Sequence, residues 1–155
     1  GEPAAIAPGC FTSRPEIGVG VVDIGSLAAA VSGGTAGQIV DARAAARFAG
    51  EAPEPRPGLR AGHIPGSHNL PFNKLLNEDG TYLKGAAIRQ LFLDAGIDPD
   101  APVTASCGSG ITACVLAAGL ALAGNGNVTI YDGSWTEWGS SDEPFEIGPS
   151  TPTAR

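Results

Sequence analysis

The sequence predicts an α/β domain with a central, mostly parallel β-sheet flanked by helices. Short apolar stretches typical of strands alternate with helical segments along the chain, which is the pattern of parallel α/β sheets. The 23 glycines and 13 prolines indicate many loops and tight turns between them. With 155 residues, 43% of them hydrophobic, the chain is long enough for one domain with its own core.

The expected elements follow one another in a regular order. Asp23 can cap a helix over 25–30, and residues 51–62 must form a loop because prolines interrupt both helices and interior strands. Strands are expected at 38–40, 70–72, 103–106 and 128–131. Further helices are expected at 43–49, 86–95 and 111–123. We expect one domain over 17–142, an extended linker at 1–16 and a loose tail at 143–155.

Composition excludes several classes of function. Nine Lys and Arg residues against 16 Asp and Glu give a net charge of −7, so nucleic-acid binding is not expected. The longest apolar run, 115–123, is too short to cross a bilayer, and the start does not resemble a signal peptide. Three cysteines without metal-ligand spacing favour a reducing compartment. The chain is therefore predicted to be cytoplasmic, without a metal or other cofactor and without a membrane partner.

The segment around Cys107 has the features of an anion-binding loop. A strand runs into Cys107, and Gly108 and Gly110 let the following backbone curl so that its N–H groups point inward. The N-terminus of the next helix adds further N–H groups and partial positive charge. A thiolate at Cys107 would be stabilised there, and Ser109 could donate to a bound sulfur or to the substrate. The alternative is a buried, inert cysteine, the interpretation that we prefer for Cys114.

The sequence Cys107-Gly108-Ser109-Gly110-Ile111-Thr112 resembles the active loop of 3-mercaptopyruvate sulfurtransferases, which belong to the rhodanese superfamily. Three other segments resemble rhodanese signatures in the same order, so that the resemblance covers about residues 38–140: Asp41-Ala42-Arg43, Gly62-His63-Ile64-Pro65-Gly66-Ser67 and Asp132-Gly133-Ser134-Trp135-Thr136-Glu137-Trp138. The resemblance implies a rhodanese-like fold, with Cys107 and Ser109 as catalytic residues.

In that family, the cysteine takes sulfur from the donor as a persulfide and passes it to a thiol acceptor, such as thioredoxin or a small thiol. Family members have two rhodanese-like halves, and this chain resembles the second. The resemblance therefore implies an N-terminal rhodanese-like half as a partner, in the same gene product or as a separate chain. That half would supply a third catalytic residue, an Asp.

The anionic substrate of such an enzyme needs a cation, and the only Lys or Arg after Cys107 is Arg155. The segments Arg47-Phe48-Ala49-Gly50 and Glu51-Ala52-Pro53-Glu54-Pro55-Arg56 resemble the family pattern whose two arginines bind the substrate carboxylate and keto group. The resemblance thus assigns substrate binding to Arg47 and Arg56. The alternative is surface pairing of these arginines with the nearby glutamates. Arg43 is expected to pair with Asp41, and the role of Arg60 stays open.

Other interpretations remain beside this one. Thiosulfate-preferring rhodaneses usually place basic residues in the loop, whereas this chain has Gly108 and Ser109 there, which favours mercaptopyruvate over thiosulfate. A related cysteine phosphatase would need an arginine at Ala113, and a noncatalytic rhodanese-type module often loses the loop residues retained here. His63 could act as a base, although we favour a structural turn, and His68 is expected at the surface. Trp135 is a candidate for a pocket wall.

Overall fold

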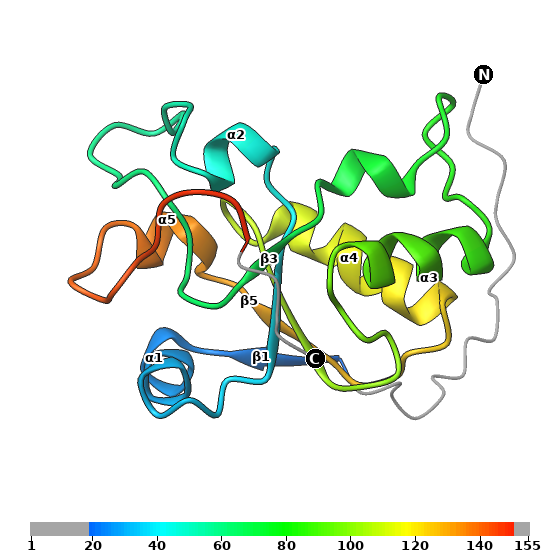
Figure 1. Cartoon of the computed structure of the whole chain (residues 1–155), viewed down its shortest axis with the longest axis horizontal. Coiled ribbons are helices and arrows are strands. Elements are labelled where there is room, and N and C mark those ends of the chain that lie inside the picture. The colour runs from blue at the N-terminus through cyan, green and yellow to red at the C-terminus, as the bar shows by residue number, and fades with distance from the viewer. Residues whose placement is uncertain (1–18, 151–155) are drawn as a thin grey trace, which may run out of the picture.

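The computed structural model describes residues 19–150, which form a five-stranded sheet in the order β1-β5-β4-β2-β3 (Figure 1). The strands are β1 (Val19–Val22), β2 (Gln38–Asp41), β3 (His68–Asn69), β4 (Val103–Ser106) and β5 (Val128–Tyr131). Every pairing between neighbouring strands is parallel. The predicted α/β architecture is therefore confirmed.

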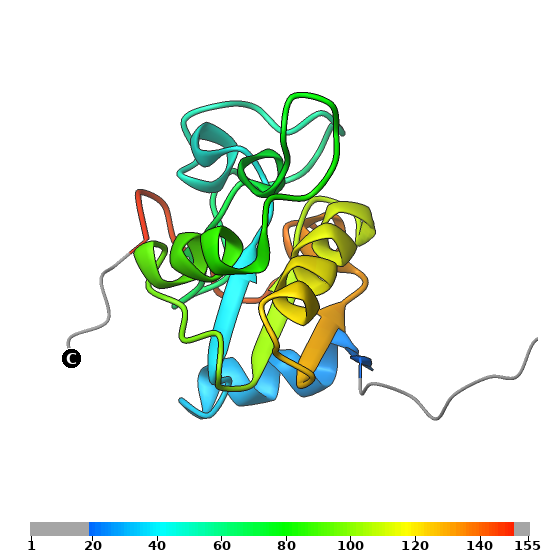
Figure 2. The same cartoon turned by 90° about the vertical axis from the view of Figure 1, so that its right-hand side faces the viewer.

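Helices cover both faces of this sheet (Figure 2). They are α1 (Ile24–Ser32), α2 (Ala45–Phe48), α3 (Gly85–Asp94), α4 (Ile111–Leu122) and α5 (Ser134–Trp138), together with a 3-10 helix, η1 (Phe72–Leu75). Helices α3 and α4 pack against each other on one face, and α1 lies on the opposite face (Figure 2). Asp23 caps α1 as expected, because its Oδ1 accepts from the amide of Ser26 at 2.8 Å.

The core consists of two apolar clusters, one on each side of the sheet, as parallel sheets require. The cluster beneath α3 and α4 includes Val40, Leu75, Ile88, Phe92, Leu116 and Leu120. The cluster on the α1 side includes Leu27, Ile39, Ile64, Tyr131, Trp135 and Trp138. Trp135 is fully buried in this second cluster, so it lies in the core and is not an open pocket wall.

The strand expected at 70–72 is wrong by two residues, because β3 lies at His68–Asn69 and is followed by η1. Pro71 has no N–H and ends the ladder. His68 is buried rather than at the surface, because β3 pairs with β2 and the ring lies close to Gly96.

Residues 143–150 pack against the domain, which corrects the expectation of a loose tail. The amide of His63 donates to the carbonyl oxygen of Glu146 at 2.9 Å, and the reciprocal bond has the same length. The Trp138 indole donates to the carbonyl oxygen of Pro144 at 2.7 Å, and the amide of Asn69 donates to Ser150 Oγ at 2.9 Å. The proposed linker at 1–16, with Cys10, and residues 151–155 lie outside the described residues.

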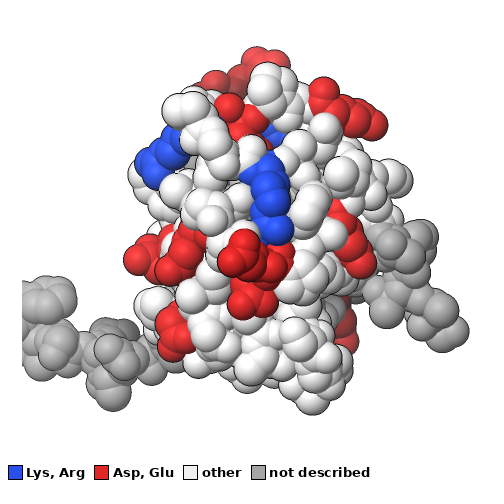
Figure 3. Space-filling view, turned by 90° about the vertical axis from the view of Figure 1, so that its left-hand side faces the viewer, with Lys and Arg blue, Asp and Glu red and all other residues white. Residues whose placement is uncertain are grey.

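The described surface agrees with the charge pattern of the sequence. On the face drawn in Figure 3, Lys and Arg side chains are separated by acidic and uncharged residues and form no continuous basic surface. Within residues 19–150, no helix has both the length and the hydropathy needed to cross a membrane.

Candidate active site

The loop after β4 lies between the carboxyl ends of β2 and β5. Asp41 at the end of β2 is in register with Ser106, and Ala105 of β4 is in register with Ile130 of β5. The segments that follow these three strands therefore meet at one edge of the sheet, which is where ligands bind in parallel α/β folds. This convergence brings together three of the motifs that the sequence analysis singled out.

Cys107 lies at the base of this loop with its sulfur surrounded by donors. Burial by itself would raise the pKa of the Cys107 thiol, but the hydroxyl of Thr112 and the amides of Ser109 and Ala113 donate hydrogen bonds to the sulfur, and Ser134 Oγ lies 3.8 Å from it. Together these bonds hold the pKa of Cys107 below its usual value. The site thus favours a thiolate, although the residue is only 1% exposed.

The loop glycines have separate structural reasons. Gly110 is the N-cap of α4 with φ of 82°, in the left-handed region, and a Cβ there would come within 2.7 Å of the carbonyl oxygen of Asp132. A Cβ on Gly108 would lie 3.0 Å from Nη2 of Arg47. Both positions are therefore restricted by close neighbours, and Gly110 is restricted by its backbone conformation as well.

The remaining loop residues are divided between the sulfur and the solvent. Ser109 contributes its amide to the sulfur, but its side chain is exposed. Ile111 begins α4 and is 75% exposed, whereas Thr112 turns its hydroxyl to Cys107. Cys114 is exposed and not in the core, so that expectation is wrong: α4 is apolar on every side, and its sequence does not tell which side packs on the sheet.

The start of α5 supports the loop from behind. The amide of Trp135 donates to the carbonyl oxygen of Cys107, and the amide of Thr136 donates to that of Gly108, each at 2.9 Å. The Thr136 hydroxyl donates to the same Gly108 oxygen at 2.5 Å. Because these carbonyls are held toward α5, the loop amides are free to point toward the sulfur. We did not single out Thr136 or Ser134, although the motif that contains them directly follows β5.

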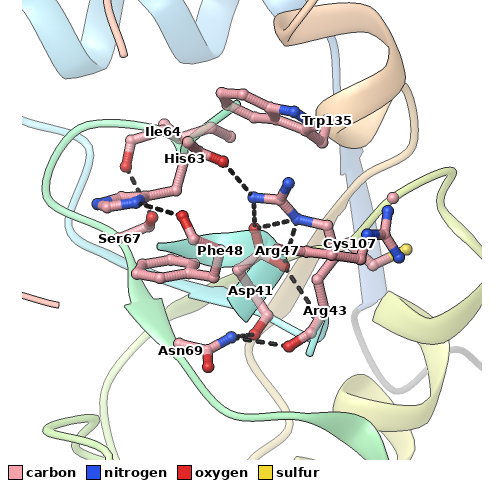
Figure 4. Close-up of polar contacts among 12 residues, drawn as sticks. Asp41, Arg43, Arg47, Phe48, His63, Ile64, Ser67, Asn69, Cys107 and Trp135 are labelled. Carbon is pink, nitrogen blue, oxygen red and sulfur yellow. Dashed lines mark hydrogen bonds and ion pairs between the residues drawn. The ribbon is translucent and has the colours of Figure 1, made fainter. Parts of the chain in front are cut away.

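Arg47 reaches this loop, and Arg56 reaches α5, which packs against the loop. Nη2 of Arg47 donates to Glu54 Oε2 at 2.6 Å and lies beside Gly108, and Figure 4 shows its side chain extending toward Cys107. Nη1 of exposed Arg56 lies 3.4 Å from Thr136 Oγ1. The pairing of Arg47 with a glutamate that we considered as the alternative is therefore present, but it places the guanidinium at the loop.

Two other basic side chains are structural. Arg43 is buried and pairs with Asp41, as expected, with Nη2 at 2.7 Å from Oδ2 (Figure 4). Arg60 donates through Nη2 to the carbonyl oxygen of Trp138 at 2.8 Å, and its guanidinium stacks on the ring of Phe145. The open question of Arg60 is thus answered by its contacts with the segment that follows α5.

His63 has the environment of a structural residue. Its ring stacks on Phe48 with centroids 3.7 Å apart, and Nδ1 donates to the carbonyl oxygen of Phe48 at 2.9 Å. Burial lowers the pKa of His63 below its usual value, despite the opposing effects of the Phe48 carbonyl and of Glu146. Neither ring nitrogen contacts Cys107, which supports a structural role for His63 in the turn and not a role as a catalytic base.

A large groove lies away from this site. A volume of about 1170 Å³ lies along β3 and α3, and the Cys107 loop is not part of its lining. Across residues 19–150, no group of three or more His, Cys, Asp or Glu side chains could hold a metal ion. The candidate site is therefore identified by its donors and its nucleophile, and not by the size of a cavity.

Comparison with known proteins identifies the family of this domain. Residues 24–141 match the family model of the rhodanese-like domain. Over 110 residues the chain is 47% identical to the 3-mercaptopyruvate sulfurtransferase of Mus musculus and 50% identical to a mitochondrial thiosulfate/3-mercaptopyruvate sulfurtransferase of Arabidopsis thaliana. These matches cover 71% and 70% of this chain but only 37% and 29% of the relatives. The crystal structure of the Tum1 protein from Saccharomyces cerevisiae aligns with a TM-score of 0.75 at 36% identity, over 84% of this chain and 47% of that one.

Proposed function

Because this chain belongs to the family of rhodanese-like domains, we propose that it is the cysteine-bearing part of a sulfurtransferase that uses 3-mercaptopyruvate. The observation that carries the proposal is the position of the Cys107 sulfur, which receives hydrogen bonds from loop amides and from the Thr112 hydroxyl and lies at the loop where Arg47 ends. The names of the similar proteins support the same reaction type.

In the proposed reaction the Cys107 thiolate attacks the sulfur of 3-mercaptopyruvate. The carbon–sulfur bond breaks, its electron pair remains as the enolate of pyruvate, and the enolate takes up a proton. Cys107 then carries a persulfide, whose outer sulfur is attacked by the thiolate of a small thiol or of thioredoxin. This second step releases the Cys107 thiolate, so the cycle needs no external oxidant.

The proposed roles of the other residues follow from their positions. Arg47 and Arg56 bind the substrate carboxylate and keto group, because a guanidinium pairs with a carboxylate through two parallel hydrogen bonds. The amides of Ser109 and Ala113 and the Thr112 hydroxyl stabilise the sulfur anion. The exposed hydroxyl of Ser109 faces solvent, where it can donate to the bound substrate.

Mass spectrometry of the intact protein tests the first step. After incubation with 3-mercaptopyruvate, the chain should gain the mass of one sulfur atom, and peptide analysis should place that sulfur on Cys107. Dithiothreitol should remove it. A persulfide on Cys114 instead, or none on any cysteine in the presence of a preceding rhodanese-like half, would contradict the proposal.

Replacing Arg47 or Arg56 by alanine should lower kcat/KM for 3-mercaptopyruvate by about 30- to 100-fold, because each change removes charge-assisted hydrogen bonds to the substrate. Arg47→Lys keeps the charge but loses the planar fork, so it should lie between the wild type and Arg47→Ala. Lys74→Ala, which removes an exposed cation of η1, is the matched control. Equal kinetics for all four variants would exclude substrate binding by the arginines.

Thiosulfate is the second candidate donor, because one similar protein is named for both donors. The ratio of kcat/KM for the two donors decides between them, and we expect mercaptopyruvate to be preferred because the loop carries no cation of its own. A phosphatase is disfavoured by the buried Ala113, which leaves no arginine for a phosphate at that position. If the domain were a noncatalytic module instead, Cys107 would react with iodoacetamide no faster than a free thiol.

The chain spans about a third of the length of the curated relatives that it matches. We therefore include a preceding rhodanese-like half in the proposal, as the source of the further catalytic Asp that the resemblance implies. The cytoplasmic location stays a prediction, since one of the similar proteins is named mitochondrial.

A further inference from the structure

We propose that Ser134 is a positioning residue for the Cys107 loop, and that its hydroxyl fixes the loop so that the remaining amides converge on the sulfur. The inference deepens the proposed function, on which its relevance to sulfur transfer rests. Its contacts, however, are independent of which donor supplies the sulfur. No role for this serine followed from the motif that contains it.

The hydroxyl of Ser134 joins both ends of the loop. Its Oγ accepts from the amide of Cys107 at 3.0 Å and from the amide of Gly110 at 3.1 Å, and it donates to the carbonyl oxygen of Tyr131 at 2.8 Å. These three bonds use the whole capacity of a hydroxyl, which has one hydrogen and two lone pairs. The Ser134 side chain therefore connects both ends of the loop to the last residue of β5.

The loop amides are divided between this hydroxyl and the sulfur. The amides of Cys107 and Gly110 point to Ser134, whereas those of Ser109 and Ala113 point to the Cys107 sulfur. Ser134 Oγ also lies 3.8 Å from that sulfur. A loop that lost its anchor could turn the first pair of amides elsewhere, and the second pair would no longer be held in place.

The backbone at Ser134 indicates that the side chain matters. Its φ is 50°, and no other residue except glycine has a positive φ among residues 19–150. Glycine adopts this conformation at lower cost. Ser134 is also fully buried, so bulk water does not reach the two amides that it accepts from. A strained serine at a buried position is explained by the need for its hydroxyl.

The test measures the alkylation of Cys107 by iodoacetamide between pH 5 and 10 in a background with Cys10→Ser and Cys114→Ser, which leaves Cys107 as the one thiol. Ser134→Ala removes the hydroxyl, and Ser134→Gly removes it while relieving the backbone. Ser140→Ala is the matched control, because it deletes an exposed serine hydroxyl at the other end of α5. Arg47 and Asp132, the charged side chains closest to the loop glycines, are unchanged in all of them.

We expect the pKa of Cys107 to rise by about one unit in both Ser134 variants, so that alkylation at neutral pH slows by about tenfold. The rates should converge with that of the parent at high pH, and Ser140→Ala should follow the parent throughout. In sulfur transfer, kcat should fall while the KM for 3-mercaptopyruvate stays the same.

An unchanged pH profile in a folded Ser134→Gly variant would overturn the proposal, and so would the unfolding of both Ser134 variants while Ser140→Ala remains folded. The two levels of inference are distinguishable. If the parent has a low Cys107 pKa but forms no persulfide, only the proposed function is contradicted. If both Ser134 variants form the persulfide as readily as the parent, only the role of Ser134 is contradicted.

Discussion

The Cys107→Ser variant should transfer sulfur from neither donor above the uncatalysed rate, a loss of at least about 1000-fold. A serine hydroxyl remains protonated near neutral pH, and oxygen cannot hold a transferred sulfur as a persulfide. The hydrogen bonds that lower the pKa of the thiol cannot compensate for a different atom. Pyruvate release from 3-mercaptopyruvate in the presence of a thiol acceptor measures the effect.

Cys114→Ser is the control for this variant. Cys114 lies on α4, the helix that follows the loop, but it is exposed, and its sulfur donates a hydrogen bond to the carbonyl oxygen of Gly110 at 3.5 Å. We expect Cys114→Ser to keep the activity of the parent. If Cys107→Ser kept its activity and Cys114→Ser lost it, the nucleophile would be Cys114, and our assignment of Cys107 would be wrong.

The Arg43→Ala variant should lose about 3–5 kcal/mol of the free energy of unfolding, because it leaves the buried carboxylate of Asp41 without a cation and leaves Glu54 paired with Arg47 alone. Arg43 bonds to both oxygens of Asp41, to the carbonyl oxygen of Gly62 and to Oε1 of Glu54. Its side chain is 1% exposed, and those of Asp41 and Glu54 are each 3% exposed. Urea unfolding followed by circular dichroism measures the change.

Arg89→Ala is the matched control for this loss. Arg89 also forms an ion pair, with Asp100, but its side chain is 36% exposed and that of Asp100 is 69% exposed, so its removal should cost far less stability than the removal of Arg43. Arg43→Lys should resemble Arg43→Ala more than the parent, because one ammonium cannot reach three separate acceptors. If Arg43→Ala and Arg89→Ala lowered the free energy of unfolding by the same amount, the buried ion pairs of Arg43 would not stabilise the fold more than the exposed pair of Arg89.

The sequence predicted the elements with strong local signals. The strands before Cys107 and after Gly126 are present at the predicted residues, because each is a short apolar run bounded by glycine, proline or polar residues. We did not predict the first strand, although Val19-Gly20-Val21-Val22 is a short apolar run before Asp23; it lies at the edge of the sheet, with Val19 and Val21 exposed. α5 has only five residues, which is too few for a helical period to be recognised.

At the candidate site, the sequence predicted the nucleophile and the loop but not what supports them. A glycine-bearing turn between a strand and a helix has a local pattern, so Cys107 stands out. The contacts of Ser134 and Thr136 join residues more than 20 positions apart, and they depend on the neighbouring position of β4 and β5 in the sheet. Local periodicity in the sequence does not predict which strands are neighbours in the sheet. For this reason the contacts of Ser134 and Thr136 with the loop were not predicted.

The guanidinium of Arg47 occupies the space into which a side chain at position 108 would project. A methyl group on residue 108 would already crowd the guanidinium, and Glu54 keeps that guanidinium from swinging away. A longer side chain at position 108 therefore requires the Arg47 guanidinium to move from its place beside Glu54. The cation that we propose for the substrate therefore comes from α2, and the glycine at position 108 leaves room for it beside the loop.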